Sequence, residues 1–349
     1  MSTDRFDVVV IGGGAAGLSA ALVLGRARRA VAVVDAGRPR NAPAAHMQGY
    51  LSRDGLPPAE LLAMGRREVR AYGVALIDGA ATAVDGGAAD GFTVHLDGRG
   101  PVVARRVLLA TGLTDVLPDI SGLVHRWGRD LLHCPYCHGY EVRDQPLGVL
   151  GGTPGAVQHA LLVRQWSTDV LFFPHTDGVD DGEREQLSAR GVGLVEGRVA
   201  GLVVADDRLV GVELEDGRRV ARSAVFVRPR LSANTAVAQS AGCLLDDNGW
   251  PTTDETGRTS VPGIWAAGNV ADPRAQVITA AGEGSSAAIA LNADLVADDV
   301  ARDVATSRAL RAMVAPARVP HRPQPLDRPS TVVDGSLSSP DPQVNHPIG

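Results

Sequence analysis

Short apolar runs that end at glycine or at a polar residue set the pattern of this chain. Residues 8–11 are all apolar, a cluster of glycines follows them, and an Ala- and Leu-rich stretch continues to residue 24. The glycines interrupt what would otherwise imitate a membrane span, so the segment predicts a buried strand, a tight turn and a helix. A second apolar run ends at Asp35, and we expect a strand–helix–strand unit up to about residue 79.

Two further apolar runs end at small polar groups. Residues 107–110 are followed by Thr111, and residues 263–267 are followed by Gly268 and Asn269. Open α/β sheets place ligand contacts beyond the carboxyl ends of their strands. Thr111, Gly268 and Asn269 are therefore candidate ligand contacts.

A second glycine-rich turn follows the apolar run at residues 147–150. Its sequence is G-x-T-x-x-A from residue 151, so Thr153 takes the place of the middle glycine and hinders the close approach of a pyrophosphate. After the next predicted strand, the arginines that would hold a 2′-phosphate are missing. Only His175 and Arg184 are possible cations there, among the acidic residues Asp177, Asp180, Asp181, Glu183 and Glu185. These features predict a second doubly wound unit that lacks the residues needed to bind a nucleotide.

The composition changes sharply near the end of the chain. Residues 291–314 have apolar positions near helical spacing and predict a closing helix. Residues 316–349 contain eight prolines and no periodic apolar face, which predicts a disordered, Pro-rich tail without a core.

The overall composition narrows the class of protein. The 349 residues are 44% hydrophobic and 21% charged, which is typical of a soluble globular protein with room for two domains. The chain has no lysine, so lysine-dependent sites such as P-loops are excluded. A net charge of −6 argues against a nucleic-acid partner, and the N-terminus lacks the basic segment and cleavage site of a signal peptide. We expect a cytoplasmic protein without a membrane segment.

The first glycine-rich turn has the spacing of a dinucleotide-binding site. Gly12, Gly14 and Gly17 separate a predicted strand from a predicted helix, and Asp35 follows where a ribose hydroxyl would be bound. The first glycine permits the tight turn, the second lets the backbone approach a pyrophosphate, and the third lets helix and strand pack closely. Amides at the helix start then face the phosphates. Either NAD or the ADP half of FAD fits this pattern.

The stretch "HCPYCH" at residues 133–138 allows three kinds of chemistry: c-type haem attachment, a zinc site or a redox disulfide. Haem attachment requires export, which the N-terminus does not indicate. Adjacent His–Cys pairs cannot easily surround one zinc ion, and the third cysteine, Cys243, has no partner motif. The pair Cys134 and Cys137 therefore predicts a redox disulfide without a metal. We expect Cys243 to be a small buried residue and His133 to have a structural role.

Together these motifs resemble the low-molecular-weight thioredoxin reductases and the thioredoxin-reductase-like dithiol oxidases. The shared motifs are the first turn, the "ATG" at residues 110–112, the "CPYC" at 134–137 and the flavin signature at 259–284. The resemblance implies an α/β protein of two doubly wound, Rossmann-type domains with a three-layer ββα architecture. It also implies a homodimer.

The same resemblance implies a particular division of the chain. A discontinuous FAD-binding domain is expected at 1–115 plus 243–315. A central domain like the NADPH domain of the reductases, at 116–242, would carry the C-x-x-C motif, and the Pro-rich tail would follow at 316–349.

FAD is the cofactor that the resemblance implies. It places the pyrophosphate on the first turn, the adenosine ribose on Asp35, the ribityl chain on Asn269 and the isoalloxazine end on Gln276 and Val277, with Asn41 also in contact with the flavin. The full set of expected FAD-binding residues is Gly12, Gly13, Gly14, Ala15, Ala16, Gly17, Asp35, Asn41, Thr111, Gly268, Asn269, Gln276 and Val277.

Three departures from the reductases favour the oxidase branch. Asn269 and His138 each replace an Asp of the reductases, and their NADPH-binding His and Arg residues are absent around residues 174–181. The oxidases convert the dithiol of a small natural product to an intramolecular disulfide, with O2 as the electron acceptor and hydrogen peroxide as a product.

The resemblance also suggests a role for each residue of the motif. Cys134 would exchange with the substrate, Cys137 would pass the electrons to FAD, and His138 would accept the substrate's proton. Two other functions remain open. One is an NADPH-dependent thioredoxin-disulfide reductase that acts on a thioredoxin-like protein, and the other is a flavin redox sensor without turnover.

Overall fold

A seven-stranded sheet is the largest of the four sheets in the computed structural model, which describes residues 4–314. The predicted tail at 316–349 lies outside the described residues. The strands follow the order β3-β2-β1-β6-β5-β4, with β17 paired to β6, and β1 is parallel to both β2 and β6. Their bounds are β1 (Arg5–Ile11), β2 (Val31–Asp35), β3 (Ala75–Asp78), β4 (Ala81–Gly87), β5 (Gly91–Leu96), β6 (Arg99–Leu109) and β17 (Ile264–Ala266).

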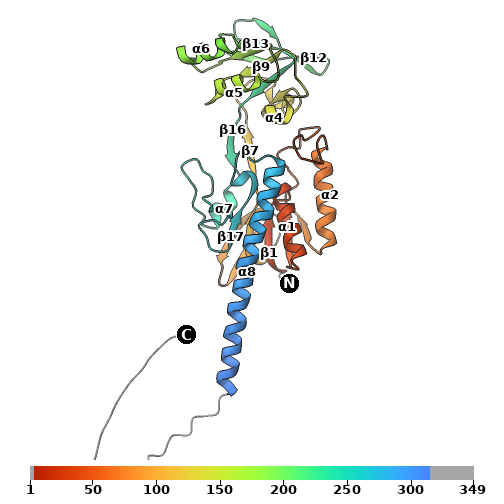
Figure 1. Cartoon of the computed structure of the whole chain (residues 1–349), viewed down its shortest axis with the longest axis vertical. Coiled ribbons are helices and arrows are strands. Elements are labelled where there is room, and N and C mark those ends of the chain that lie inside the picture. Colours follow the sequence, from red (N-terminus) through yellow and green to blue (C-terminus); the bar gives the residue numbers. More distant parts are fainter. Residues whose placement is uncertain (1–3, 315–349) are drawn as a thin grey trace, which may run out of the picture. The chain divides into compact units, whose positions relative to one another are not determined.

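Alternate residues of β1 enter different cores because successive side chains of a strand point to opposite faces. Val8 and Val10 pack with the helices α1 (Ala15–Arg26), α2 (Pro58–Ala71) and α8 (Val277–Val314). Val9 and Ile11 pack with β4, β5 and α7 (Ala236–Ser240) on the other face. The parallel strands of this sheet thus form a middle layer between the helices on one side and the antiparallel strands β4 and β5 on the other. This arrangement confirms the predicted ββα architecture (Figure 1).

A second, five-stranded parallel sheet carries the middle of the chain, in the order β11-β10-β9-β15-β8. Helices α5 and α6 pack on one face, and the antiparallel strands β12, β13 and β14 pack on the other (Figure 1). Its strands are β8 (Leu131–Leu132), β9 (Leu147–Leu150), β10 (Val170–Phe173), β11 (Gly193–Leu194) and β15 (Ala224–Val227). The covering elements are α5 (Ala156–Val163), α6 (Asp181–Ala189), β12 (Val199–Ala205), β13 (Arg208–Leu214) and β14 (Arg219–Ala221).

The chain runs between the two sheets through a short antiparallel ribbon of β7 (Leu113–Val116) and β16 (Arg230–Ala233). Asn234 stabilises the ribbon through two hydrogen bonds to Thr111. Its side-chain amide donates to the Thr111 backbone carbonyl at 2.9 Å, and its backbone carbonyl accepts from the Thr111 hydroxyl at 2.8 Å. The remaining short helices are α3 (Leu123–Arg126), α4 (Pro135–His138) and the 3-10 turn η1 (Gly268–Val270). The exact domain boundaries stay a prediction.

Helix α8 begins at Val277, well before the predicted start at residue 291. The glycines of its first turns hid the helix in the sequence, since glycine has low helix propensity. At Gly284 the reason for glycine is tertiary: a Cβ there would overlap the carbonyl group of Ala16 in α1. The glycine lets α8 approach α1 closely.

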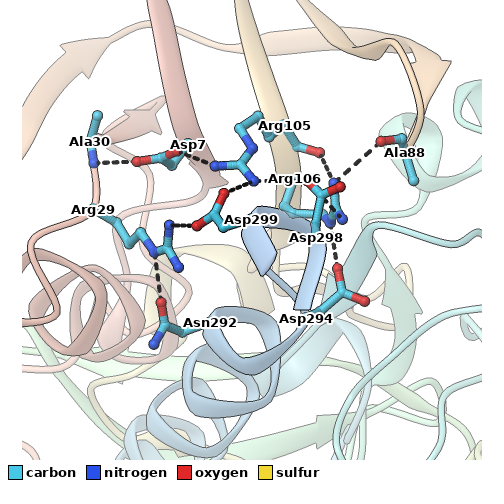
Figure 2. Close-up of polar contacts among 10 residues, drawn as sticks. All are labelled: Asp7, Arg29, Ala30, Ala88, Arg105, Arg106, Asn292, Asp294, Asp298 and Asp299. Atoms are coloured by element: carbon cyan, nitrogen blue, oxygen red, sulfur yellow. Dashed lines mark hydrogen bonds and ion pairs between the residues drawn. The ribbon is translucent and has the colours of Figure 1, made fainter. Parts of the chain in front are cut away.

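A network of arginines and carboxylates binds α8 to the larger sheet (Figure 2). Arg106 on β6 pairs with Asp294 of α8 at 2.6 Å, and its side chain is only 6% exposed. The neighbouring Arg105 pairs with both Asp298 and Asp299 of the helix, at 2.7 and 2.6 Å. These pairs fix the middle of α8 on the sheet.

None of the helices in the described part of the chain is long and apolar enough to span a membrane.

Candidate functional site

The first glycine-rich turn forms a cradle between β1 and α1. Gly12 has φ +112°, a conformation that side chains rarely adopt, and a Cβ there would overlap the Ala110 carbonyl. A Cβ on Gly17 would overlap the carbonyl oxygen of Gly12. No atom lies within 4 Å of the place where a Cβ of Gly14 would stand, so the backbone at the start of α1 is open to a ligand. The turn therefore fits the pyrophosphate of a dinucleotide.

Asp35 lies at the end of β2, directly beside this turn. Its carboxylate stands 2.5 Å from the position that a Cβ on Gly13 would take, so Asp35 and the turn are in contact. Arg66 of α2 donates to Asp35 at 2.6 Å and to Asp78 at 2.7 Å. Arg66 thus holds the Asp35 carboxylate at the rim of the cradle. The sequence does not reveal this contact, because 31 residues separate Asp35 from Arg66.

The ends of β6 and β17 close the cradle from the other side. Gly268 follows β17, and a Cβ there would stand 2.8 Å from the Ala16 side chain at the start of α1. Glu283 in α8 accepts a hydrogen bond from the Gly268 amide at 2.9 Å. Partial burial raises the pKa of Glu283 above its usual value. Sequence reasoning missed this carboxyl group, although it lies inside the flavin signature.

Thr111 lies just after the end of β6, as predicted, and its side chain has a partner within the protein. Its hydroxyl donates to the Asn234 carbonyl, so the side chain fastens the ribbon of β7 and β16. The expected contact of Thr111 with a cofactor stays a prediction.

Asn269 is held by hydrogen bonds through both ends of its amide. The nitrogen donates to the carbonyls of Asp272 at 3.0 Å and Ala275 at 2.9 Å, while the oxygen accepts from Arg40 at 3.2 Å. Arg40 in turn makes a bidentate ion pair, at 2.7 and 2.8 Å, with Asp115 of β7, whose side chain is only 6% exposed. An Asp at position 269 could not donate to two carbonyls, which gives Asn a physical reason at this position.

The remaining predicted cofactor residues lie near the start of α8 and in the loop after β2. Gln276 precedes the helix, Val277 is its first residue, and both are half-buried. The place of a Cβ on Gly49 is 3.4 Å from the Gln276 side chain, so the loop reaches this helix start. Asn41 is half-buried in the same loop, where its carbonyl accepts from the Ala44 amide at 3.1 Å.

The C-x-x-C motif lies at the start of α4, directly after β8. Cys134 is the N-cap residue, Pro135 occupies the first helical position where its missing N–H costs nothing, and Cys137 follows in the same turn. A disulfide joins the two cysteines, whose Cα atoms are 5.2 Å apart. Tyr136 between them is exposed and packs edge-on against Trp166 at 5.4 Å between ring centroids.

Three histidines lie in or beside the disulfide segment: His133 and His138 flank the two cysteines in the sequence, and His159 packs against His133. Burial lowers the pKa of His138, so its imidazole is neutral at pH 7, and the nearby Glu141 opposes the shift. Burial and then the charge of Arg40 lower the pKa of His133 to about 4, which links this segment electrostatically to the Arg40 and Asn269 pair. His159 of α5, not singled out in the sequence, is buried edge-on against His133 with centroids 6.3 Å apart, and burial lowers its pKa to about 3.

Cys243 is buried, as expected from the sequence. Its thiol lies 3.6 Å from the Thr259 hydroxyl, and burial raises its pKa above the usual value. Within residues 4–314 no group of three or more His, Cys, Asp or Glu side chains is placed to hold a metal ion.

The fold and site together define a class of protein: a disulfide oxidoreductase with a dinucleotide cradle between β1 and α1 and a C-x-x-C disulfide at the start of α4. The chain belongs to the pyridine nucleotide-disulphide oxidoreductase family, which matches residues 6–284. It is a thioredoxin reductase-like enzyme, and FAD is its cofactor.

Relatives support this family assignment over most of the chain. The thioredoxin reductase sirT of Leptosphaeria maculans is 34% identical over 314 residues, which span 85% of this chain and 96% of the relative. The thioredoxin reductase tcpT of Claviceps purpurea is 32% identical over 77% of this chain and 88% of its own length. The crystal structure of HlmI is 57% identical with a TM-score of 0.85, and covers 89% of this chain and 98% of HlmI.

Proposed function

We propose that this enzyme oxidises a small-molecule dithiol to an intramolecular disulfide and uses O2 as the electron acceptor. One observation supports this direction of electron flow: the two cations that the sequence offers for the 2′-phosphate of NADPH, His175 and Arg184, have other partners in the structure. Arg184 pairs with Glu196 at 2.7 Å. His175 accepts the Val199 N–H at 3.0 Å, and burial lowers its pKa, so it is neutral at pH 7. Electrons would therefore enter through the cysteines.

The reaction balances as two thiol–disulfide exchanges. A substrate thiolate attacks Cys134, which breaks the Cys134–Cys137 bond, forms a mixed disulfide and leaves Cys137 as a thiolate. The second substrate thiolate then attacks the mixed disulfide and releases the cyclic disulfide together with a reduced cysteine pair. His138 accepts a proton from the substrate. When bound, FAD would supply the two-electron redox chemistry that connects the reduced cysteine pair to O2, with hydrogen peroxide as the product.

We also propose which residues contact FAD. Gly12 to Gly17 hold the pyrophosphate, Asp35 the adenosine ribose, and Asn269, with Arg40 behind it, the ribityl region. The open backbone at Gly14 and the contact between Gly13 and Asp35 support the first two assignments. We further propose a cytoplasmic homodimer, with the FAD-binding domain at 1–115 plus 243–315 and the central domain at 116–242.

We expect a dithiol, and not NADPH, to reduce the bound flavin. The test is anaerobic mixing of the yellow protein with each donor, followed by the flavin absorbance. Dithiothreitol serves as the model dithiol, and peroxide released after air is readmitted measures turnover. Fast bleaching by NADPH would instead favour an NADPH-dependent thioredoxin reductase, the function that the names of sirT and tcpT suggest. Reduction without peroxide release would favour a redox sensor.

We expect His138→Ala to slow dithiol oxidation by about 10²-fold, the usual contribution of a general base. The neutral imidazole is the active form, and burial lowers its pKa from the usual value of a histidine, so the wild-type rate should fall as pH decreases below that lowered pKa. The variant should lose this acid limb of the kcat/KM profile and retain its flavin. His125→Ala, which changes a histidine outside the motif, is the control. An unchanged pH profile in His138→Ala would assign the residue a structural role.

A further inference from the structure

The loop that follows β10 lies directly on the second glycine-rich turn. A Cβ on Gly151 would overlap the backbone of Pro174, and a Cβ on Gly152 would meet His175 and Thr176 at 3.3 and 3.4 Å. These glycines therefore serve the packing of one protein loop on another. In a dinucleotide-binding turn the same absence of side chains would serve the approach of a pyrophosphate.

Two backbone amides of this turn are bonded within the protein. The Gly152 amide donates to the carboxylate of Asp177 at 2.7 Å. The Ala156 amide, the first in α5, donates to the Thr153 carbonyl at 3.2 Å. Position 154 is proline, which has no amide hydrogen to offer. A phosphate at this turn would meet two amides that already have acceptors and a carboxylate that is negatively charged like itself.

We propose that Asp177 is a specificity-determining residue: its carboxylate occupies the Gly152 amide as an internal anion and thereby excludes the phosphates of nicotinamide dinucleotides from the central sheet. This inference deepens the proposed oxidase function, on which its biological meaning rests, because it names the group that keeps the alternative electron donor away.

A cation remains at the turn once Asp177 is removed. Arg228, which directly follows β15, is exposed and donates to the Gly155 carbonyl at 3.3 Å. Sequence reasoning missed it, because 73 residues separate the two groups along the chain. A turn with a free Gly152 amide and this guanidinium has both elements of an anion site, an N–H donor and a positive charge.

The test measures binding of inorganic pyrophosphate and of NADPH to the purified flavoprotein by calorimetry. We expect Asp177→Ala to bind pyrophosphate on the order of 10-fold more tightly than the wild type, the range expected for one hydrogen bond to a charged group. Asp181→Ala removes an identical charge four residues away without a bond to the turn, and should match the wild type. Adding Arg228→Ala to Asp177→Ala should remove the gain.

The outcomes separate this inference from the proposed function. Equal pyrophosphate affinity for Asp177→Ala and Asp181→Ala would overturn the inference, and the oxidase function would still stand if dithiols alone reduce the flavin. Reduction of the wild type by NADPH would overturn the function. Because Asp177 is exposed, the variant should fold, and Asp177→Asn provides a second variant that removes the charge but keeps an acceptor. Faster hydrogen exchange at Gly152 in Asp177→Ala would confirm the lost bond independently.

Discussion

Replacing either Cys134 or Cys137 with Ser is expected to reduce dithiol oxidation by at least about 10³-fold, as loss of a catalytic nucleophile does in other enzymes. A single thiol cannot form the Cys134–Cys137 disulfide, so it cannot take two electrons from a substrate. Both variants should stay yellow, because the glycine cradle around Gly12 contains neither cysteine. The measurement is peroxide release with dithiothreitol, together with the flavin-to-protein absorbance ratio.

Cys243→Ala is the matched control for this experiment. The Cys243 thiol is buried against Thr259 and takes no part in the proposed exchange. The Cys243→Ala variant should therefore be as active as the wild type. More than a tenth of wild-type turnover in either Cys134→Ser or Cys137→Ser would show that the disulfide is not obligatory, and the assigned roles would be wrong.

The second large effect concerns stability. Asp294→Ala should lower the free energy of unfolding by about 3 kcal/mol, because it removes the 2.6 Å partner of the buried Arg106 and leaves that charge poorly compensated. The remaining carboxylate, Asp298, is 3.8 Å from Arg106 (Figure 2). Asp294 also pairs with Arg258 at 2.8 Å, which adds a second lost contact. Urea denaturation followed by circular dichroism measures the change.

A double variant tests the stated cause. Arg106→Met combined with Asp294→Ala removes the buried charge as well as its partner, so it should be more stable than Asp294→Ala alone. Asp303→Ala, which removes an exposed carboxylate elsewhere on α8, should change stability by less than about 0.5 kcal/mol. A loss below about 1 kcal/mol in Asp294→Ala would mean that the network in Figure 2 contributes little.

The sequence predicts the parts of this protein that depend on local spacing. The turn from Gly12 to Gly17 forms a cradle because strand, glycines and helix follow one another directly, and Asp35 meets Gly13 because β2 is parallel to β1. The disulfide of Cys134 and Cys137 needs only one helical turn. Alternating apolar residues in β1 likewise predict its two buried faces.

Local sequence patterns do not predict contacts between segments that lie far apart along the chain. Arg40 bonds Asp115 and Asn269, which lie 75 and 229 residues away, and no motif marks it. His159 is buried beside the disulfide segment only because α5 packs on the second sheet. In each case the partner is fixed by the tertiary fold, so a single sequence holds no local pattern that reveals it.

Glycines are hard to interpret from the sequence because the same residue serves different purposes. Gly284 lies inside α8, before the helix start predicted at residue 291, and it permits contact with α1. Gly151 and Gly152 suggested a degenerate nucleotide turn, and in the structure they accommodate the loop around Pro174. Only the neighbouring backbone tells these purposes apart.

The burial of the third cysteine makes the enzyme convenient to assay with alkylating reagents. Folded protein in its resting form should take up no label, whereas the substrate-reduced form should gain two adducts, both within residues 134–137. Intact mass spectrometry could therefore count electron pairs held by the polypeptide after each mixing time, without reference to the colour of the prosthetic group.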